Sequence, residues 1–551
     1  MRDDPTEAHR VAEVPPPHAL DSPMRGAGVL SRRTATPRAT QVSVARQALE
    51  DCLPFGLWLL AVGVVFLYAA GDGLLPRVAP FYAVLGGMVV LWLLEAGRGS
   101  ARDISFYLLV PLLISAVQNI YLGLIAPTAI TPQVHALVMG NIVYAAGGVF
   151  VLLLRGLSRT SRSAPWWALA ACLATAAYAI VVGAAMGSDG VAALASLRNL
   201  LSPYVFFLLG ILAAPRVSLD RFLGYVAALG WVIVSFGVAE RYLIPDLWLA
   251  LNIEQLWPLK GLKVHPEMGL PSNFFASEMV GGQYIRRMAS SYADPISFGA
   301  VAFLVFTVAW FTRRTFLMYA AIGCCLLAVS KAAFVGFAVF SLVASYRCAG
   351  RMRFVVSVAL TAAGVLGFLA YSLAHSTGSL FLHVEGFMAA VRQLPDYPFG
   401  RGVGNTGVVA VMLDEAPPEL IESGLGMIVG QLGIPGLLVF ACFLALIARA
   451  SFLRVQDVRL RTFLEILFWQ VVLNIVFNEV ALSPNSSAGY FTILGLLSSG
   501  PRPEAVPVPR APSFWFPLAP PEPDVVEAPE TGAEAVGPGA AMLDAKSEER
   551  A

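Results

Sequence analysis

Six cationic side chains occupy similar positions in this chain, either at the ends of apolar stretches or in the two long polar segments between them. They are Arg198, Arg286, Arg287, Lys331, Arg392 and Arg401. An Arg guanidinium binds phosphate oxygens as a planar fork, and a Lys ammonium binds them as a point charge. These residues therefore indicate recognition of a diphosphate at the level of the headgroups. The alternative is that each one only reaches to lipid headgroups.

Motifs of soluble enzymes are absent from the sequence. It contains no Walker loop, HExxH, dinucleotide fingerprint or CxxC. The glycine-rich segment GRGVGNTG (400–407) does not lie between a strand and a helix, which excludes a nucleotide site and predicts a tight turn or the wall of a pocket. The six Cys residues lack ligand or disulfide spacing and are expected to be free thiols. No His/Asp/Glu cluster has ligand spacing on the outer side, so we expect no metal and no cofactor.

The composition indicates what kind of protein carries these six cations. Hydrophobic residues make up 57% of the 551, and charged residues only 13%. Average soluble domains are about 45–50% apolar and about 25% charged. This excludes a soluble globular enzyme, a disordered protein and a nucleic-acid binder.

Apolar stretches of membrane-spanning length follow one another between two polar tails. Because lipid satisfies no backbone groups, these stretches must be helices, and their continuous apolar runs exclude a barrel. The sequence predicts an all-α polytopic bundle of about 12–14 spans within residues 52–500, flanked by disordered cytoplasmic tails at 1–51 and 501–551. The spans begin near Leu53, Val78, Ile104, Val134, Pro165, Ser196, Phe222, Ile296, Thr315, Ala332, Phe354, Gly424, Thr462 and Ser486.

The charges between the spans predict the orientation. With the N-terminus inside, the even-numbered connections should be cytoplasmic and rich in Arg or Lys. They carry Arg98, Arg102, Arg155, Arg159, Arg162, Arg216, Arg221, Arg313, Arg314, Arg347, Arg351, Arg353, Arg449, Arg454, Arg459 and Arg461. The short odd-numbered connections hold only Arg77 and Lys331. Both termini are therefore expected to be cytoplasmic, and the six cations listed first face outward against this rule.

Two odd-numbered connections are long, at about 240–295 and 375–423, and long loops in compact proteins are usually functional. Trp248 and Trp257 make the first loop a candidate interfacial helix. In the second loop, Leu380, Val384, Phe387 and Val391 repeat at helical spacing and predict an amphipathic helix over the outer face.

Four segments in order resemble the O-antigen ligase and polysaccharide polymerase superfamily of bacterial membrane glycosyltransferases. They are IRRMASSYADPISFGAVAF, AVSKAAFVGF (with Lys331 where Arg is more usual), PDYPFGRGVGNTG and IESGLGMIVGQLGIPGLLVF. The resemblance covers roughly residues 196–500. Ligases usually carry His where this chain has Glu422, so the likeness is closer to the polymerases.

The resemblance implies a multi-pass protein of the bacterial inner membrane that transfers a glycan from undecaprenyl diphosphate to a hydroxyl acceptor. Arg287 and Lys331 would neutralise the departing diphosphate, and Glu422 would act as the general base. Arg198, Arg286, Arg392, Arg401 and His383 would bind diphosphate or glycan. Glu422 could instead be a solvated carboxylate or an ion-pair partner. His375 and His383 are rival bases.

The implied partners are the lipid-linked glycan, membrane lipids and a chain-length regulator, without nucleic acid. Two alternatives remain open. One is a ligase that moves a finished glycan to lipid A–core or to a protein. The other is a secondary transporter or flippase. Polar residues within the spans favour this alternative, namely Gln118, Asn119, Asn141, Gln431, Asn474, Asn478 and Glu479.

Overall fold

The computed structural model describes residues 103–125, 132–157, 165–259, 263–280, 283–348, 351–374, 378–407, 423–453 and 455–499. Both predicted tails and the spans expected near Leu53 and Val78 lie outside these ranges. The described chain is mostly helical. Among the described residues, seven helices are long and apolar enough to cross a membrane.

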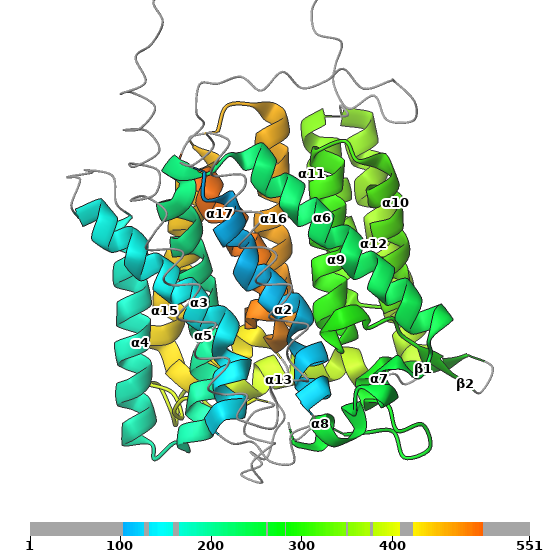
Figure 1. Cartoon of the computed structure of the whole chain (residues 1–551), viewed down its shortest axis with the longest axis horizontal. Helices are drawn as coiled ribbons and strands as arrows, with labels where there is room; N and C mark the ends of the chain where they lie inside the picture. The colour runs from blue at the N-terminus through cyan, green and yellow to red at the C-terminus, as the bar shows by residue number, and fades with distance from the viewer. Residues whose placement is uncertain are drawn as a thin grey trace, which may run out of the picture.

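The helices form one bundle (Figure 1). Its long helices are α2 (Ser105–Ile125), α3 (Pro132–Leu157), α4 (Trp166–Ala185), α5 (Gly190–Ala213), α6 (Leu219–Val238), α9 (Pro295–Phe311), α10 (Thr315–Ala328), α11 (Lys331–Cys348), α12 (Arg351–Ala374), α15 (Gly424–Phe452), α16 (Val458–Phe477) and α17 (Pro484–Ser498). The helices α9, α10 and α17, with 17, 14 and 15 residues, are shorter than a full span of about 20.

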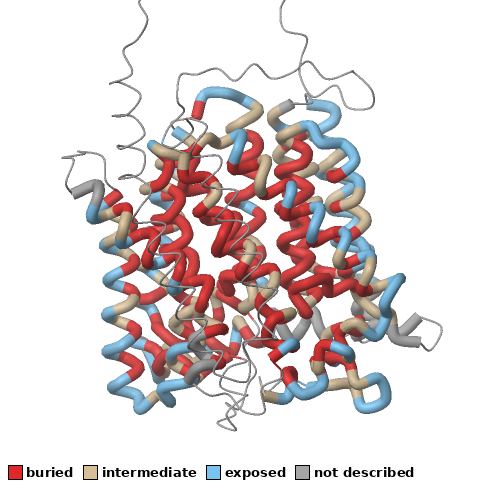
Figure 2. Tube along the Cα trace, viewed as in Figure 1, coloured by how far each residue is buried: buried red, intermediate tan, exposed pale blue. Residues whose placement is uncertain are grey.

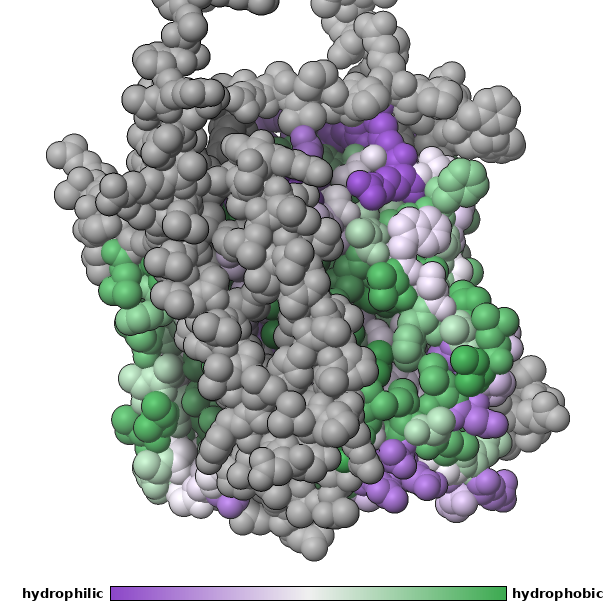
Figure 3. Space-filling view, in the orientation of Figure 1, coloured by the Kyte–Doolittle hydropathy of each residue, from purple (hydrophilic) through white to green (hydrophobic). Residues whose placement is uncertain are grey.

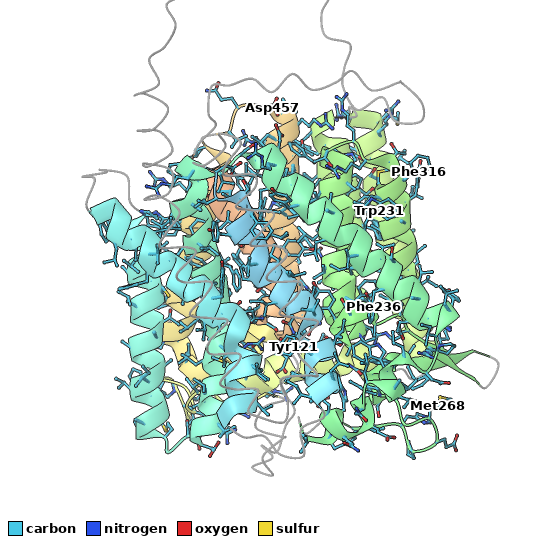
Figure 4. The ribbon with its side chains drawn as sticks, in the orientation of Figure 1. Tyr121, Trp231, Phe236, Met268, Phe316 and Asp457 are labelled. Atoms are coloured by element: carbon cyan, nitrogen blue, oxygen red, sulfur yellow. The ribbon has the colours of Figure 1, made fainter. Side chains whose placement is uncertain are left out.

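The loops gather at one end of the bundle and the arginine-rich connections at the other (Figure 1). Met268 in the first long loop and Asp457 between α15 and α16 mark the two ends (Figure 4). At the arginine-rich end, ion pairs join Arg221 to Asp103 at 2.9 Å and Arg347 to Glu465 at 2.5 Å. The charge pattern therefore separates the two ends of the bundle as the sequence predicts.

A buried interior and an exposed apolar surface characterise the bundle. Buried residues line the middle of the helices, whereas α4 and α12 present exposed apolar side chains such as Ile180 and Leu366 (Figure 2). On the right of the visible face, an apolar band separates hydrophilic side chains at the two ends (Figure 3). An apolar band of this kind suits the hydrocarbon core of a bilayer.

The first long loop folds into short elements. They are the π-helical turn η3 (Ala239–Leu243), α7 (Leu247–Ala250), α8 (Ile253–Leu259), η4 (Ser272–Phe274), the antiparallel strands β1 (Phe275–Val280) and β2 (Gln283–Arg286), and η5 (Ser290–Tyr292). Trp248 and Trp257, which make this loop a candidate interfacial helix in the sequence, lie on the short helices α7 and α8 and are both buried within the protein. Trp248 packs against Phe236 and Phe274 and forms a second core beneath the loop.

The second long loop contains the predicted helix, α13 (Gly378–Arg392), which packs on α15. The glycine-rich segment follows, and Gly400, Gly402, Gly404 and Gly407 all have positive φ, which confirms the tight turn. A break in α15 receives this turn. At Gly433, which has φ 61° and ψ −154°, the helix is interrupted, and Pro435 follows.

Candidate functional site

Arg287 and Lys331 lie at the same end of the bundle, close to one turn of chain. The Nε of Arg287 donates to the carbonyl oxygen of Ala328 at 2.9 Å, and one terminal nitrogen donates to the carbonyl oxygen of Asn273 at 3.3 Å. Ala328 ends α10, and Lys331 begins α11 three residues later. Three residues span at most about 11 Å. Two cations from separate parts of the sequence therefore lie beside the α10–α11 turn.

The α10–α11 turn is recessed into the bundle from the end that carries the long loops. The Nε2 of Gln470 donates to the carbonyl oxygen of Ala332 at 2.7 Å, although α16 continues to Phe477. Seven residues of helix correspond to about 10 Å. The short α10 explains the recess, and Ser330 is fully buried against Gly299 of α9. Lys331 is half-buried and is the first residue of α11. It therefore lies level with the middle part of α16 near Gln470, not with the end of that helix.

Arg286, next to Arg287, has a different environment. Its terminal nitrogen lies 3.0 Å from Oε1 of Glu240 and 2.9 Å from the carbonyl oxygen of Pro245. The Glu240 side chain is 0% exposed and the Arg286 side chain 16% exposed. The second carboxylate oxygen of Glu240 accepts from the backbone N–H of Ala289 at 3.4 Å. Neighbouring arginines in the sequence therefore have different partners.

Arg198 lies among neutral polar groups inside the bundle. Its terminal nitrogen is 3.4 Å from Oε1 of Gln118 on α2 and 3.4 Å from Oδ1 of Asn141 on α3. Asn141 also donates to Oδ1 of Asn485 on α17 at 3.2 Å. The Arg198 Nε is buried without a hydrogen-bond partner. Amide groups from α2 and α3 therefore contact this guanidinium at long distances, and Asn141 links them to α17.

Arg401 is held by the glycine-rich turn and the break in α15. Its backbone N–H donates to the carbonyl oxygen of Gly430 at 2.9 Å, and the N–H of Ile434 donates to that of Pro398 at 2.9 Å. These bonds satisfy helix groups that the break exposes. The guanidinium donates to Oε1 of Gln393 at 3.2 Å and lies 5.2 Å above the Tyr397 ring.

The glycine-rich turn also reaches α5 near Arg198. The Nε2 of Gln431 donates to the carbonyl oxygen of Thr406 at 2.9 Å and lies 3.3 Å from the hydroxyl of Ser196. Ser196 is two residues before Arg198 on α5. The segment that holds Arg401 is therefore joined to the helix that carries Arg198.

The remaining predicted residues are less informative. Arg392 is exposed at the end of α13, and His383 lies within the same helix. Glu422 and His375 lie outside the described residues. Ser423, which follows Glu422, donates to the carbonyl oxygen of Val476 at 2.5 Å, so the second loop ends against the end of α16.

Two carboxylates at this end were not among the predicted site residues. Glu240 has just been described. Glu479 begins η6 (Glu479–Leu482), a turn that contacts α5, α9, α15, α16 and α17. A Cβ added at Gly407 would lie 2.9 Å from Oε2 of Glu479, so the glycine-rich turn passes against this carboxylate. The sequence signal for both residues is an acidic side chain at the end of an apolar stretch.

A buried phenol also lies beside the Arg286–Arg287 segment. Burial raises the pKa of Tyr292 above its usual range. The Tyr292 carbonyl accepts from the side-chain amide of Asn119 on α2. Within the described ranges, no group of three or more His, Cys, Asp or Glu side chains could hold a metal ion. Cys172, Cys324, Cys325 and Cys442 are free thiols.

Comparison with known proteins does not assign the chain. No protein-family model matches it, and no curated protein matches it significantly. The arrangement of side chains must therefore support any functional assignment.

Proposed function

We propose that this chain is a metal-independent membrane glycosyltransferase that polymerises undecaprenyl-diphosphate-linked repeat units at the outer face of the bacterial inner membrane. The proposal is supported mainly by one observation. Arg287 and Lys331 lie beside the same turn, recessed by about two helical turns (~10 Å) from the loop end of an apolar bundle. A cation at such a depth is a candidate functional group.

The proposal includes a finer topology. With the two apolar stretches near Leu53 and Val78, the chain would have about 12–14 spans, with both termini in the cytoplasm and both long loops outside. The concentration of arginines at the end opposite the long loops supports this orientation.

The proposed reaction exchanges one bond to an anomeric carbon for another. An acceptor hydroxyl gives its proton to a carboxylate, and its oxygen attacks the anomeric carbon of the donor glycan. The bond from that carbon to the diphosphate oxygen breaks, and the lipid diphosphate leaves with the electron pair. Arg287 and Lys331 neutralise the charge that develops on the leaving group.

Arg198, Arg392, Arg401 and His383 are proposed to bind the substrates, whereas Arg286 is paired with Glu240. Arg198 would contact diphosphate from within the bundle, because its present partners are neutral amides at 3.4 Å. Arg401, Arg392 and His383 would bind glycan or a second diphosphate from the second loop. Glu422 remains the proposed base, and Glu479 is a second candidate because the glycine-rich turn passes against its carboxylate.

A secondary transporter or flippase is the second candidate function. The polar cluster of Arg198, Gln118, Asn141 and Asn485 inside the bundle favours it. A ligase that uses the same donor is the alternative within the enzyme class.

Reconstitution in liposomes tests the proposal. Purified protein given only a lipid-linked oligosaccharide should lengthen the glycan, which gel separation of the labelled product detects. Matched liposomes without protein are the control. Translocation of the oligosaccharide without a new glycosidic bond would identify a transporter, and transfer only to an added lipid A–core acceptor would identify a ligase.

A further inference from the structure

Glu240 is an acidic residue buried at the end of an apolar helix. It lies in η3, where the backbone changes from α-helical to π-helical hydrogen bonding, and the N–H of Ile244 donates to the carbonyl oxygen of Ala239 at 2.7 Å. Single π-helical turns occur frequently at functional sites. The carboxylate is completely buried. A buried carboxylate is stable only where other groups compensate its charge.

The compensating groups all come from the segment that carries Arg287. Oε1 of Glu240 accepts from the Arg286 guanidinium at 3.0 Å, and Oε2 accepts from the N–H of Ala289 at 3.4 Å. The same guanidinium nitrogen donates to the carbonyl oxygen of Pro245 at 2.9 Å. Glu240 therefore holds the chain on both sides of Arg287 and Met288.

The residues between these two contacts face α10. The backbone N–H of Met288 donates to the carbonyl oxygen of Leu327 at 2.9 Å, and the Arg287 side chain donates to that of Ala328. The N–H of Arg287 donates to the carbonyl oxygen of Phe274 at 2.6 Å. The segment is thus fixed to η3 through residues 286 and 289 and to the α10–α11 turn through residues 287 and 288.

We infer that Glu240 and Arg286 form a buried clamp that positions Arg287 beside the α10–α11 turn and Lys331, and that Arg286 is a positioning residue without contact to the substrate. This inference depends on the proposed function for its consequence in catalysis, but the clamp itself is independent of any activity. Arg287 can neutralise the diphosphate only while the neighbouring residues hold its backbone in place.

Donor kinetics in liposomes test this role. Glu240→Gln keeps the shape of the side chain and removes its charge. A displacement of about 1 Å at a reacting group can reduce the rate 10²-fold, so kcat/KM for the lipid-linked donor should fall by 10- to 100-fold. Asp103→Asn is the matched control, because it neutralises the Arg221–Asp103 pair at the opposite end and should stay within about twofold of wild type.

A neutral pair separates positioning from substrate binding. Glu240→Gln combined with Arg286→Gln restores a hydrogen-bonded pair without charge. Its kcat/KM for the donor should be about tenfold higher than that of the single Glu240→Gln variant. If Arg286 instead bound the diphosphate, the double variant would be at least as inactive as the single one, and the inference would be overturned.

A double-mutant cycle tests the connection to Arg287. In an Arg287→Lys background, which retains a charge but loses the planar fork, Glu240→Gln should cause less than about a threefold further loss. A full additional loss would show that Glu240 acts independently of Arg287, and would overturn the inference.

Hydrogen exchange provides a readout that needs no activity. In the Glu240→Gln variant, the amides of Met288 and Ala289 should exchange at least tenfold faster than in wild type, whereas those of α16 should not change. Unchanged exchange at both amides would refute the clamp. Faster exchange in a protein that does not lengthen glycan would support the clamp and contradict the proposed function.

Discussion

Gly433→Ala should uncouple the second loop from α15. Gly433 has φ 61° and ψ −154°, a region that is essentially restricted to glycine. A Cβ at this position would also lie 2.5 Å from the Gly400 nitrogen and 2.6 Å from the Phe399 carbonyl carbon. Because these are backbone atoms, they cannot move aside as a flexible side chain would.

The cost follows from these two effects. Backbone strain in this region amounts to about 1–3 kcal/mol, and overpacking against backbone adds about 1–3 kcal/mol. The segment 398–402 is expected to yield before the bundle unfolds, because it is bound to α15 through few hydrogen bonds. The loop should detach from the helix and displace Arg401 from Gln393 and Tyr397.

Limited proteolysis and thermal unfolding in detergent measure this effect. Gly433→Ala should expose the chain near Arg401 to trypsin and lower the unfolding temperature by several degrees. The matched control is Gly323→Ala in α10, where an added Cβ meets nothing within 4 Å and alanine favours a helix by about 1 kcal/mol. Unfolding temperature and trypsin resistance equal to wild type in Gly433→Ala would refute the reasoning.

Three further outcomes are expected in the liposome assay. Arg287→Ala and Lys331→Ala should each reduce kcat by about 10²–10³-fold, since each removes charge from the leaving diphosphate, and full polymer length in both variants would contradict the proposed site. Replacing the general base by Gln should lower the rate of glycan transfer by about 10²–10⁴-fold, so comparing Glu422→Gln with Glu479→Gln identifies which carboxylate is the base. Arg198→Gln should raise the donor KM by about tenfold with normal expression, and an unchanged KM would exclude Arg198 from binding.

Local patterns predicted the elements that depend on local sequence. The apolar spacing of Leu380, Val384, Phe387 and Val391 correctly predicted a helix, α13. It did not predict which face is buried, because Val384 is exposed whereas Ala389 and Ala390 are buried. The glycines of 400–407 correctly predicted a tight turn, because they permit positive φ. The break in α15 at Gly433, against which this turn packs, could not be predicted locally, because it depends on contacts between distant parts of the chain.

Composition alone could not distinguish two environments for tryptophan. Trp248 and Trp257 suit an interfacial belt, but the loop forms its own core, and both are buried in it. Similarly, Arg286 and Arg287 are adjacent and chemically identical, and the sequence assigned both to the diphosphate. Only the fold brings Glu240, 46 residues earlier, to Arg286, and brings the backbone carbonyls of Asn273 and Ala328 to Arg287.

Arg198 is compensated differently from the arginines that form ion pairs. At the arginine-rich end, Arg221, Arg347 and Arg461 pair with the carboxylates of Asp103 and Glu465. At the loop end, Arg286 pairs in the same way with Glu240. Arg198, eight residues into α5, instead has amide oxygens at 3.4 Å as its hydrogen-bond acceptors. Amide dipoles neutralise a guanidinium less completely than a carboxylate does, and for this reason we propose Arg198 as an anion-binding group. The proposed transferase would bring a diphosphate to Arg198 from the loop end alone, whereas a transporter would also have to open this cluster toward the arginine-rich end.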